Sequence, residues 1–331
     1  MRMLMKEIVT AFVMGMVVPG MILNFAAAAL EAPPPVQEET TVPTAAPERA
    51  ALAVLVRGLD GVTREMDMDA YITGVVLAEM PAYFEEEALK AQAVVARTYA
   101  RKAYVYGGKH GDGSVCTRSS CCQAYKTEED YLKDGGREAD LERIRAAVAE
   151  TSGYVLTYDG VLIEATYFSC SGGSTEDARA VWGTDFPYLQ AVESPGEEAA
   201  AYYRDTVRFA ADQFERLLGV DLNGTPAGWF GEVTYTDGGG VDCMVIGGHA
   251  FKGTQLRSLL GLRSAAFEVK ADTDSVIITT RGFGHRVGMS QYGADAMAVK
   301  GCSYEEILAH YYQGTALTRL GIDDAEEMRY D

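Results

Sequence analysis

The feature that most constrains this chain is an uncharged, mostly apolar run at residues 8–30. A helix needs about 20 such residues to cross a bilayer, so the run predicts a transmembrane anchor. Arg2 and Lys6 precede it, and a basic flank stays in the cytoplasm, so the rest of the chain is expected to face outward. A cleaved signal peptide is the alternative, because small residues at 26–29 lie near a possible cut. Both alternatives place the rest of the chain on the same side of the membrane.

Residues 31–50 are rich in Pro, Thr and Glu. Such a segment cannot pack a core and is expected to form an extended stalk. The sequence thus predicts a membrane anchor at residues 1–30, a linker at residues 31–50 and a folded domain at residues 51–331.

The composition limits the partners of the folded part. The formal net charge is −19, which argues against a nucleic-acid partner, because binding to phosphates relies on Lys and Arg. The same charge argues against long-range attraction to an anionic cell wall, so a wall substrate would need a local groove. Apolar residues make up 48% of the chain, which is enough to bury a core.

The secondary-structure pattern predicts a single mixed α+β body with a groove. A long amphipathic helix is expected at about residues 85–106, stopped by Gly107 and Gly108. Asp159 and Gly160 separate two apolar runs, which is a strong hairpin signal. The regular alternation of strand and helix that marks a doubly wound sheet is absent from the sequence. Further helices are expected near residues 209–218, 253–260 and 303–312, and further strands near residues 52–56, 232–236, 243–246, 267–271 and 275–280.

Glu79 is the first candidate catalytic residue. It follows the apolar segment 71–78 and precedes Met80 and Pro81, so its sequence neighbours hydrate it poorly. Burial raises the pKa of a carboxyl group, and an acid that protonates a glycosidic oxygen must hold its proton near neutral pH. An ordinary Glu at a helix end is the alternative interpretation of the same residues.

Residues 165–176 contain Ser169, Ser171 and Thr175 in a Gly-rich setting close to Trp182. Hydroxyl groups and a flexible backbone beside a Trp suit a groove wall where sugars hydrogen-bond and stack. A tight turn with hydroxyl caps explains the same residues equally well.

Residues 282–294 form a second Gly-rich loop, which is expected to present three polar side chains at a surface. They are His285, Ser290 and Gln291. A His with a purely structural role is the alternative for His285.

The segment between residues 110 and 122 combines one imidazole with several thiols. His110, Cys116 and Cys122 are each separated by five residues, and zinc favours such nitrogen and sulfur donors in a tetrahedral arrangement. The chain has six cysteines, and disulfides are allowed in an outward-facing protein, with fifteen full pairings possible. From the residues alone, both interpretations stay open.

Together these segments resemble the SpoIID (stage II sporulation protein D, or SpoIID/LytB) family from about residue 52 to residue 317. Three motifs carry the resemblance: Glu-Met-Pro at residues 79–81 followed by Glu-Ala-Leu-Lys-Ala-Gln-Ala at 87–93, Ser-X-Ser-Gly-Gly at 169–173, and Gly-His-X-Val-Gly-Met-Ser-Gln-X-Gly-Ala at 284–294.

The resemblance implies a lytic transglycosylase that cleaves peptidoglycan glycan strands from which an amidase has removed the stem peptides. Glu79 falls on the catalytic position of the family. One Glu then suffices, because the C6 hydroxyl of N-acetylmuramic acid attacks C1 and leaves a 1,6-anhydro product, whereas ordinary glycosidases use two carboxylates. Lys90 and Arg97 fall on basic groove positions.

The resemblance also implies a zinc ion on His110, Cys116 and Cys122. Cys121 departs from the family pattern, in which a His often stands beside the second Cys. It is a candidate for an alternative or fourth ligand, or for a disulfide with Cys170, Cys243 or Cys302.

The implied setting is the space between mother cell and forespore during engulfment, with the body outside the mother-cell membrane. The implied protein partners are the sporulation amidase SpoIIP and the membrane protein SpoIIM. Two other functions stay open: a glycan-binding module that enhances an amidase without cutting, and a zinc hydrolase. The sequence has no His-Glu-X-X-His helix, which disfavours the hydrolase.

Overall fold

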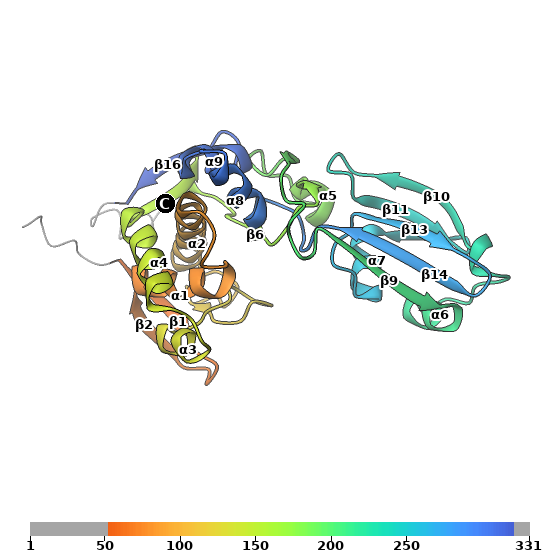
Figure 1. The fold of residues 1–331 in the computed structure, drawn as a ribbon, viewed down its shortest axis with the longest axis horizontal. Helices are drawn as coiled ribbons and strands as arrows, with labels where there is room; N and C mark the ends of the chain where they lie inside the picture. The colour runs from red at the N-terminus through yellow and green to blue at the C-terminus, as the bar shows by residue number, and fades with distance from the viewer. Residues whose placement is uncertain (1–51, 321–331) are drawn as a thin grey trace, which may run out of the picture. The chain divides into compact units, whose positions relative to one another are not determined.

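The computed structural model describes residues 52–320. The predicted membrane anchor and the whole of the predicted stalk fall outside these residues. Among the residues that the structure describes, no helix is both long enough and apolar enough to cross a membrane. The predicted mixed α+β class is confirmed (Figure 1).

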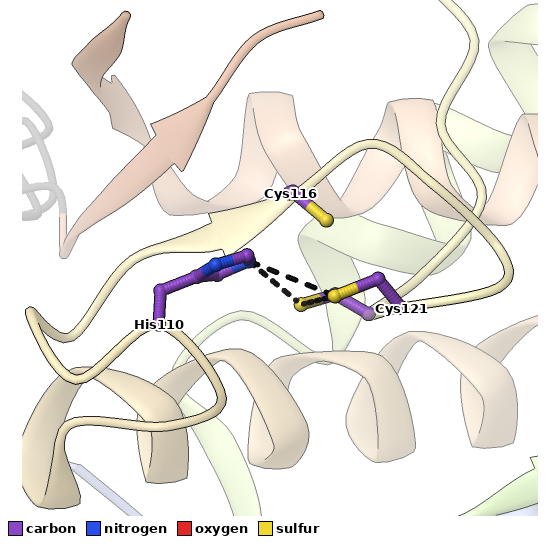
Figure 2. Close-up of side chains that lie close together, drawn as sticks. His110, Cys116 and Cys121 are labelled. Atoms are coloured by element: carbon purple, nitrogen blue, oxygen red, sulfur yellow. Dashed lines mark hydrogen bonds between the residues drawn. The ribbon is translucent and has the colours of Figure 1, made fainter. Parts of the chain in front are cut away.

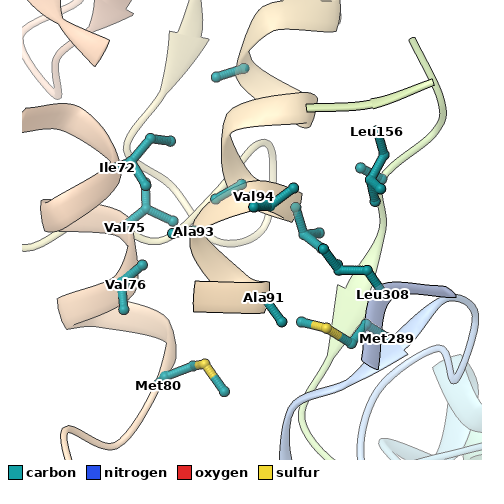
Figure 3. Close-up of a cluster of buried hydrophobic side chains, with 14 of the residues drawn as sticks. Ile72, Val75, Val76, Met80, Ala91, Ala93, Val94, Leu156, Met289 and Leu308 are labelled. Carbon is teal, nitrogen blue, oxygen red and sulfur yellow. The ribbon is translucent and has the colours of Figure 1, made fainter. Parts of the chain in front are cut away.

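The first hydrophobic core is built around two consecutive helices, α1 (Met68–Glu79) and α2 (Glu86–Tyr106). The side chain of Asp67 caps α1 by accepting a hydrogen bond from the backbone N–H of Ala70, and α2 ends at Gly107 with φ of 85°, a conformation that suits glycine. Figure 3 shows apolar side chains of the two helices meeting across the core, next to residues from other elements. The remaining helices of this part are α3 (Glu128–Lys133), α4 (Glu138–Glu150), α5 (Ala178–Trp182), α8 (Gln291–Val299) and α9 (Tyr304–Tyr311).

Four small sheets surround these helices. They are β1 (Ala53–Arg57) between β2 (Thr63–Asp67) and β3 (Val115–Cys116), β4 (Tyr154–Tyr158) between β5 (Val161–Leu162) and β16 (Ala316–Arg319), the parallel pair β6 (Tyr167–Phe168) and β15 (Met289–Ser290), and the pair β7 (Gly173–Ser174) and β8 (Glu193–Ser194). The predicted hairpin is confirmed between β4 and β5, because Asp159 and Gly160 both have positive φ, 49° and 81°.

A second hydrophobic core is formed by two three-stranded antiparallel sheets and two helices. Its elements are β9 (Arg204–Ala210), α6 (Ala211–Leu218), a 3₁₀ turn (Pro226–Gly228), β10 (Phe230–Tyr235), β11 (Val241–Ile246), β12 (His249–Lys252), α7 (Gly253–Leu260), β13 (Phe267–Ala271) and β14 (Ser275–Arg281). Gly253 begins α7 where a Cβ atom would lie 1.9 Å from the carbonyl oxygen of Val241, so only glycine fits this close approach.

A buried ion pair between Glu176 and Arg286 connects the segments that carry these residues to the turn between β10 and β11. Arg286 Nη1 lies 2.9 Å from Glu176 Oε1, and both side chains are 3% exposed. Arg286 also donates to the carbonyl oxygen of Gly238, and Gly240 N–H donates to Glu176. These contacts fix the loop that carries His285 against the second core.

Candidate active site and metal centre

Glu79 lies in the wall of a cavity of about 740 Å³, a size typical of ligand sites. Elements of the first and of the second hydrophobic core both contribute residues to its lining. The lining residues are Glu79, Tyr99, Lys109, Ser119–Gln123, Glu164–Ser169, Trp182, Phe186, Arg257, Phe283–His285 and Gln291.

The position of Glu79 follows from the way in which α1 ends. The chain becomes extended at Met80, whose N–H bonds the carbonyl oxygen of Val76, so Glu79 stands at the helix end. Oε1 of Glu79 accepts two hydrogen bonds, from the backbone N–H of Ala124 at 2.7 Å and from the Tyr167 hydroxyl at 3.2 Å. Oε2 accepts no hydrogen bond from residues 52–320, which leaves it for a ligand in the cavity.

A row of hydrogen bonds behind Glu79 fixes the direction of these donors. Tyr71 donates to Gln123 Oε1 at 3.3 Å, and Gln123 Nε2 donates to the Tyr167 hydroxyl at 3.2 Å. Burial, and then the charge of Glu79, raise the pKa of Tyr167 well above its usual value. Tyr167 therefore keeps its proton and acts as a donor to Glu79.

The candidate metal ligands lie together beside this site. One donor atom from each of His110, Cys116, Cys121 and Cys122 lies within 4.8 Å of the others. Figure 2 shows the imidazole of His110 facing the thiol of Cys121. Nε2 of His110 is 3.8 Å from Sγ of Cys121 and 3.6 Å from Sγ of Cys122, and the two sulfurs are 3.9 Å apart. The group forms a cluster that could bind a metal, as predicted for three of its members, and Cys121 adds a fourth donor.

The surroundings of Cys116 favour the ionised form of this thiol. Burial opposes ionisation of the Cys116 thiol, but hydrogen bonds from the Arg118 backbone and from His110 outweigh it and lower its pKa to about 7. A thiolate is the form in which cysteine binds metals. All six cysteines lie within the described residues and all are free thiols, so no disulfide competes for the cluster in this structure.

The cluster and the carboxyl group of Glu79 are joined through three consecutive residues. Cys122 belongs to the cluster, Gln123 bonds Tyr167, and Ala124 donates its N–H to Glu79. A metal that holds Cys122 would therefore also hold the backbone donor of Glu79 in place.

Three predicted groove residues share the cavity with Glu79: Ser169, His285 and Gln291. His285 lies against the rings of Trp182 and Phe168, with centroid separations of 5.3 and 5.7 Å. Its Nδ1 accepts a hydrogen bond from Val287 N–H at 3.1 Å, so the proton of the neutral ring is on Nε2. Burial, and then the charge of Arg257, lower the pKa of His285 to about 4, so the ring is neutral near pH 7.

Arg97 and Lys90, predicted to be groove residues, do not line the cavity. Arg97 is 0% exposed and donates to Asp69 and to the carbonyl oxygens of Val148 and Thr151, at the end of α4. The Lys90 ammonium group is surrounded by three carboxylates, at 2.6–2.9 Å, from Glu86, Glu87 and Glu150. Both cations hold helices together, and nothing of Arg97 is accessible to a sugar.

Ser171, Thr175 and Ser290 are also buried away from the cavity lining. Ser171 donates to Glu197 at 2.7 Å, and Thr175 accepts from Val192 N–H at 2.8 Å. Ser290 caps α8 by accepting from Gly293 N–H at 3.2 Å. For Ser171 and Thr175 the structure favours the alternative of hydroxyl groups bonded within the protein over a sugar contact, and the Ser290 hydroxyl is likewise used inside the protein.

Several residues of the site were not singled out from the sequence. The Ala124 donor is a backbone group, which no residue type reveals, and Gln123 carries no motif. Lys109 and Arg257 line the cavity from segments about 150 residues apart, and no local pattern joins them.

Comparisons with known proteins agree with the predicted family. The family model described as "SpoIID: Stage II sporulation protein" matches residues 58–158. Stage II sporulation protein D of Bacillus subtilis (strain 168) is 43% identical over 256 residues, covering 76% of this chain and 74% of that protein. The protein of the same name from Bacillus amyloliquefaciens is 42% identical over the same shares of the two chains. An amidase enhancer of Bacillus subtilis (strain 168) is 30% identical, covering 75% of this chain and 40% of that protein.

Proposed function

The chain belongs to the SpoIID family of stage II sporulation proteins, and on that premise we propose that it is a lytic transglycosylase. Its substrate is the bond from N-acetylmuramic acid to N-acetylglucosamine in peptidoglycan glycan strands whose stem peptides have been removed. The observation that carries the proposal is the state of Glu79: Oε1 is fixed by two donors inside a large cavity, and Oε2 is left for the ligand.

The proposed reaction uses Glu79 twice. As an acid, it gives its proton to the glycosidic oxygen while the bond from that oxygen to C1 of N-acetylmuramic acid breaks. As a carboxylate, it then takes the proton of the C6 hydroxyl, whose oxygen closes on C1. The products are a 1,6-anhydro end and a free hydroxyl on N-acetylglucosamine, and no water is consumed.

The other carboxylate in the cavity wall is already held in an ion pair, which supports Glu79 as the single acid/base. Glu164 also lines the cavity, but its Oε1 is held by Lys102 at 2.7 Å. A glycosidase that uses water or a covalent intermediate needs a second carboxylate at a defined separation. An internal hydroxyl nucleophile removes that requirement.

We further propose that the metal is zinc, held by His110, Cys116, Cys121 and Cys122. In a tetrahedral zinc site with bonds of about 2.0–2.3 Å, donor atoms lie roughly 3.5–3.8 Å apart. The separations among His110, Cys121 and Cys122 are close to this range, and all four donor atoms of the cluster lie within 4.8 Å of one another. A zinc ion bound by four protein side chains has no open position for water or substrate, so it would act as a cross-link within the protein. These residues would hold the 121–124 loop, which carries a donor to Glu79.

The cellular setting is part of the same proposal. Residues 8–30 anchor the chain, and the catalytic body works outside the mother-cell membrane during engulfment. Peptide-free strands must come from an amidase, for which SpoIIP is the candidate, and SpoIIM is the candidate membrane partner.

The second candidate function is enhancement of an amidase without cleavage. It is favoured by the similarity to the Bacillus subtilis protein named an amidase enhancer, and by the 41% exposed Trp182 in the cavity wall, where a sugar ring can stack.

Mass spectrometry of the products separates the two candidates. Peptide-free glycan is incubated with purified full-length protein, wild type beside Glu79→Gln, with Glu164→Gln as a matched carboxylate control in the same cavity. We expect 1,6-anhydro ends from the wild type and from Glu164→Gln, and none from Glu79→Gln. Anhydro products from Glu79→Gln would refute the mechanism, and binding without products from any of the three would favour the enhancer.

A further inference from the structure

Two cationic side chains line the cavity, and they differ in their partners. Lys109 donates to the carbonyl oxygen of Cys121 and lies 6.0 Å from the ring centroid of Tyr99. The guanidinium of Arg257 has neither a hydrogen bond nor an ion pair with any of residues 52–320. It is nevertheless half-buried, and burial lowers its pKa, although an arginine stays charged in proteins.

Arg257 lacks such a partner although the chain is rich in anions. Asp and Glu number 48 against 29 Lys and Arg, so acidic partners are abundant. A guanidinium with five N–H donors loses hydration when it is buried, and it is normally compensated by an anion. Arg257 therefore offers a free anion-binding group in the wall of the cavity.

The fold holds Arg257 in this place. It lies in α7, whose Leu256 and Leu260 are buried in the second core. Gly253 fixes the start of α7 against β11 by its close approach to Val241. The arginine thus enters the cavity from the second core, whereas Glu79 enters it from the first, and a ligand bound to both would span the two.

We propose that Arg257 binds the free lactyl carboxylate of N-acetylmuramic acid and thereby selects glycan strands that have lost their stem peptides. This inference rests on the proposed function. In an intact strand the lactyl group is joined to the peptide through a neutral amide. Hydrolysis of that amide releases the peptide amine and leaves a carboxylate, which matches the planar fork of a guanidinium through two parallel hydrogen bonds.

The test compares one glycan in two chemical states. Peptide-free glycan carries the carboxylate, and the same material coupled to methylamine carries a neutral amide of similar size. We expect full-length wild type to cleave the carboxylate form with kcat/KM about 10- to 100-fold higher, the range of a charge-assisted hydrogen bond. Arg257→Gln is expected to lose this preference, so that its kcat/KM values for the two glycans become equal.

Two further variants make the result specific. Lys252→Gln removes a positive charge from the neighbouring strand β12, where the side chain is 66% exposed and paired with Asp242, and it should keep the preference. Arg257→Lys keeps the charge without the fork and should retain part of it. A preference that survives in Arg257→Gln would overturn the proposal, as would a wild type that cleaves both glycans equally.

A measurement of binding tests the inference separately from catalysis. Calorimetric titration of Glu79→Gln with the two glycans should show the same preference, and the double variant with Arg257→Gln should not. If the wild type binds but never cleaves, the transglycosylase proposal fails while the binding preference still decides the role of Arg257. If cleavage depends on Glu79 but neither binding nor rate depends on Arg257, only the carboxylate inference fails.

Discussion

The hydroxyl of Tyr167 lies 3.2 Å from Oε1 of Glu79 and donates a hydrogen bond to it, although the two residues are 88 positions apart in the chain. Strand β6 brings Tyr167 to the end of helix α1, where it shares the carboxyl oxygen with the Ala124 N–H. Two donors on one oxygen restrict the rotation of the carboxyl group, so Oε2 keeps a constant direction toward the substrate.

The first prediction concerns this hydroxyl. Tyr167→Phe keeps the buried ring and removes the donor, so we expect kcat on peptide-free glycan to fall by about 10-fold, equivalent to one hydrogen bond, with little change in KM. Steady-state release of anhydro ends measures both constants. Tyr235→Phe, at a 58% exposed position of β10, is the matched control. An unchanged kcat in Tyr167→Phe would show that the carboxyl does not depend on this donor.

The second prediction concerns the number of thiolate ligands. With three Cys and one His, we expect one zinc per chain by elemental analysis. Cobalt(II) in place of zinc should give the absorption spectrum of a tetrahedral site. In Cys121→Ser the thiolate-to-cobalt charge-transfer absorption should fall by about a third, because two thiolates then bind the metal instead of three. Cys243→Ser, a free thiol of β11 outside the cluster, should change neither. If Cys121→Ser keeps the full absorption, Cys121 is not a ligand, and the protein ligands are the three predicted from the sequence.

The metal should act on catalysis through the loop. Removal by a chelator frees Cys122, and with it the neighbouring Gln123 and Ala124 that bond Tyr167 and Glu79. We therefore expect a lower melting temperature and a lower kcat together, both restored by zinc. Loss of activity without any loss of stability would instead point to a metal that touches the substrate.

The third prediction follows from the pKa of His285, which burial lowers to about 4. Above pH 6.5 the folded and unfolded states both hold a neutral imidazole, so His285 adds no pH dependence. Between pH 6.5 and pH 4 only the unfolded state binds the proton, so the free energy of unfolding falls as the pH falls, by at most about 1.4 kcal/mol per pH unit.

Urea unfolding at several pH values measures this slope. His285→Gln should flatten it between pH 6.5 and pH 4 relative to the wild type, whereas His249→Gln, at an exposed position, should not. The imidazole signals of His285 in NMR spectra should titrate with a midpoint near pH 4. A midpoint near the ordinary value of about 6.5 would contradict the burial of this ring.

Local signals predicted the elements well. The apolar periodicity and Gly107 located α2 within a residue, and Asp159 with Gly160 specified a hairpin turn because both positions need positive φ. Phe209 shows the limit of such signals. It was assigned to a helix, but it pairs with Val276 as part of strand β9, because the sheet with β14 overrides the local pattern.

The site was predictable only where a side chain carries its own chemical signature. Residue type and setting made Glu79, His285 and the thiols of the cluster candidates, whereas the Ala124 donor is a backbone group. Arg257 became a candidate only through the structure. It lines the cavity and has no hydrogen bond or ion pair with any of residues 52–320, and a sequence shows neither of these facts. Cationic residues on α2 misled the sequence interpretation for the opposite reason: their partners come from other helices.

The fourth prediction tests that last point on Arg97. Its guanidinium is fully buried and donates to Asp69 and to the carbonyl oxygens at the end of α4. Arg97→Met leaves the buried carbonyl oxygens without a donor, so we expect the free energy of unfolding to fall by about 1–3 kcal/mol, the cost of an unsatisfied buried acceptor; Asp69 is 34% exposed and adds less. Arg97→Lys should restore only part of it, because an ammonium cannot reproduce the fork.

The control is Arg216→Gln, which breaks an exposed pair with Asp212 on α6 and should leave the stability almost unchanged. Urea denaturation gives the stabilities, and KM for peptide-free glycan is measured on the folded fraction at low temperature. Because Arg97 is sealed from the cavity, KM should stay at the wild-type value in Arg97→Met. A raised KM with unchanged stability would mean that the side chain reaches the sugar after all, and that α2 moves when substrate binds.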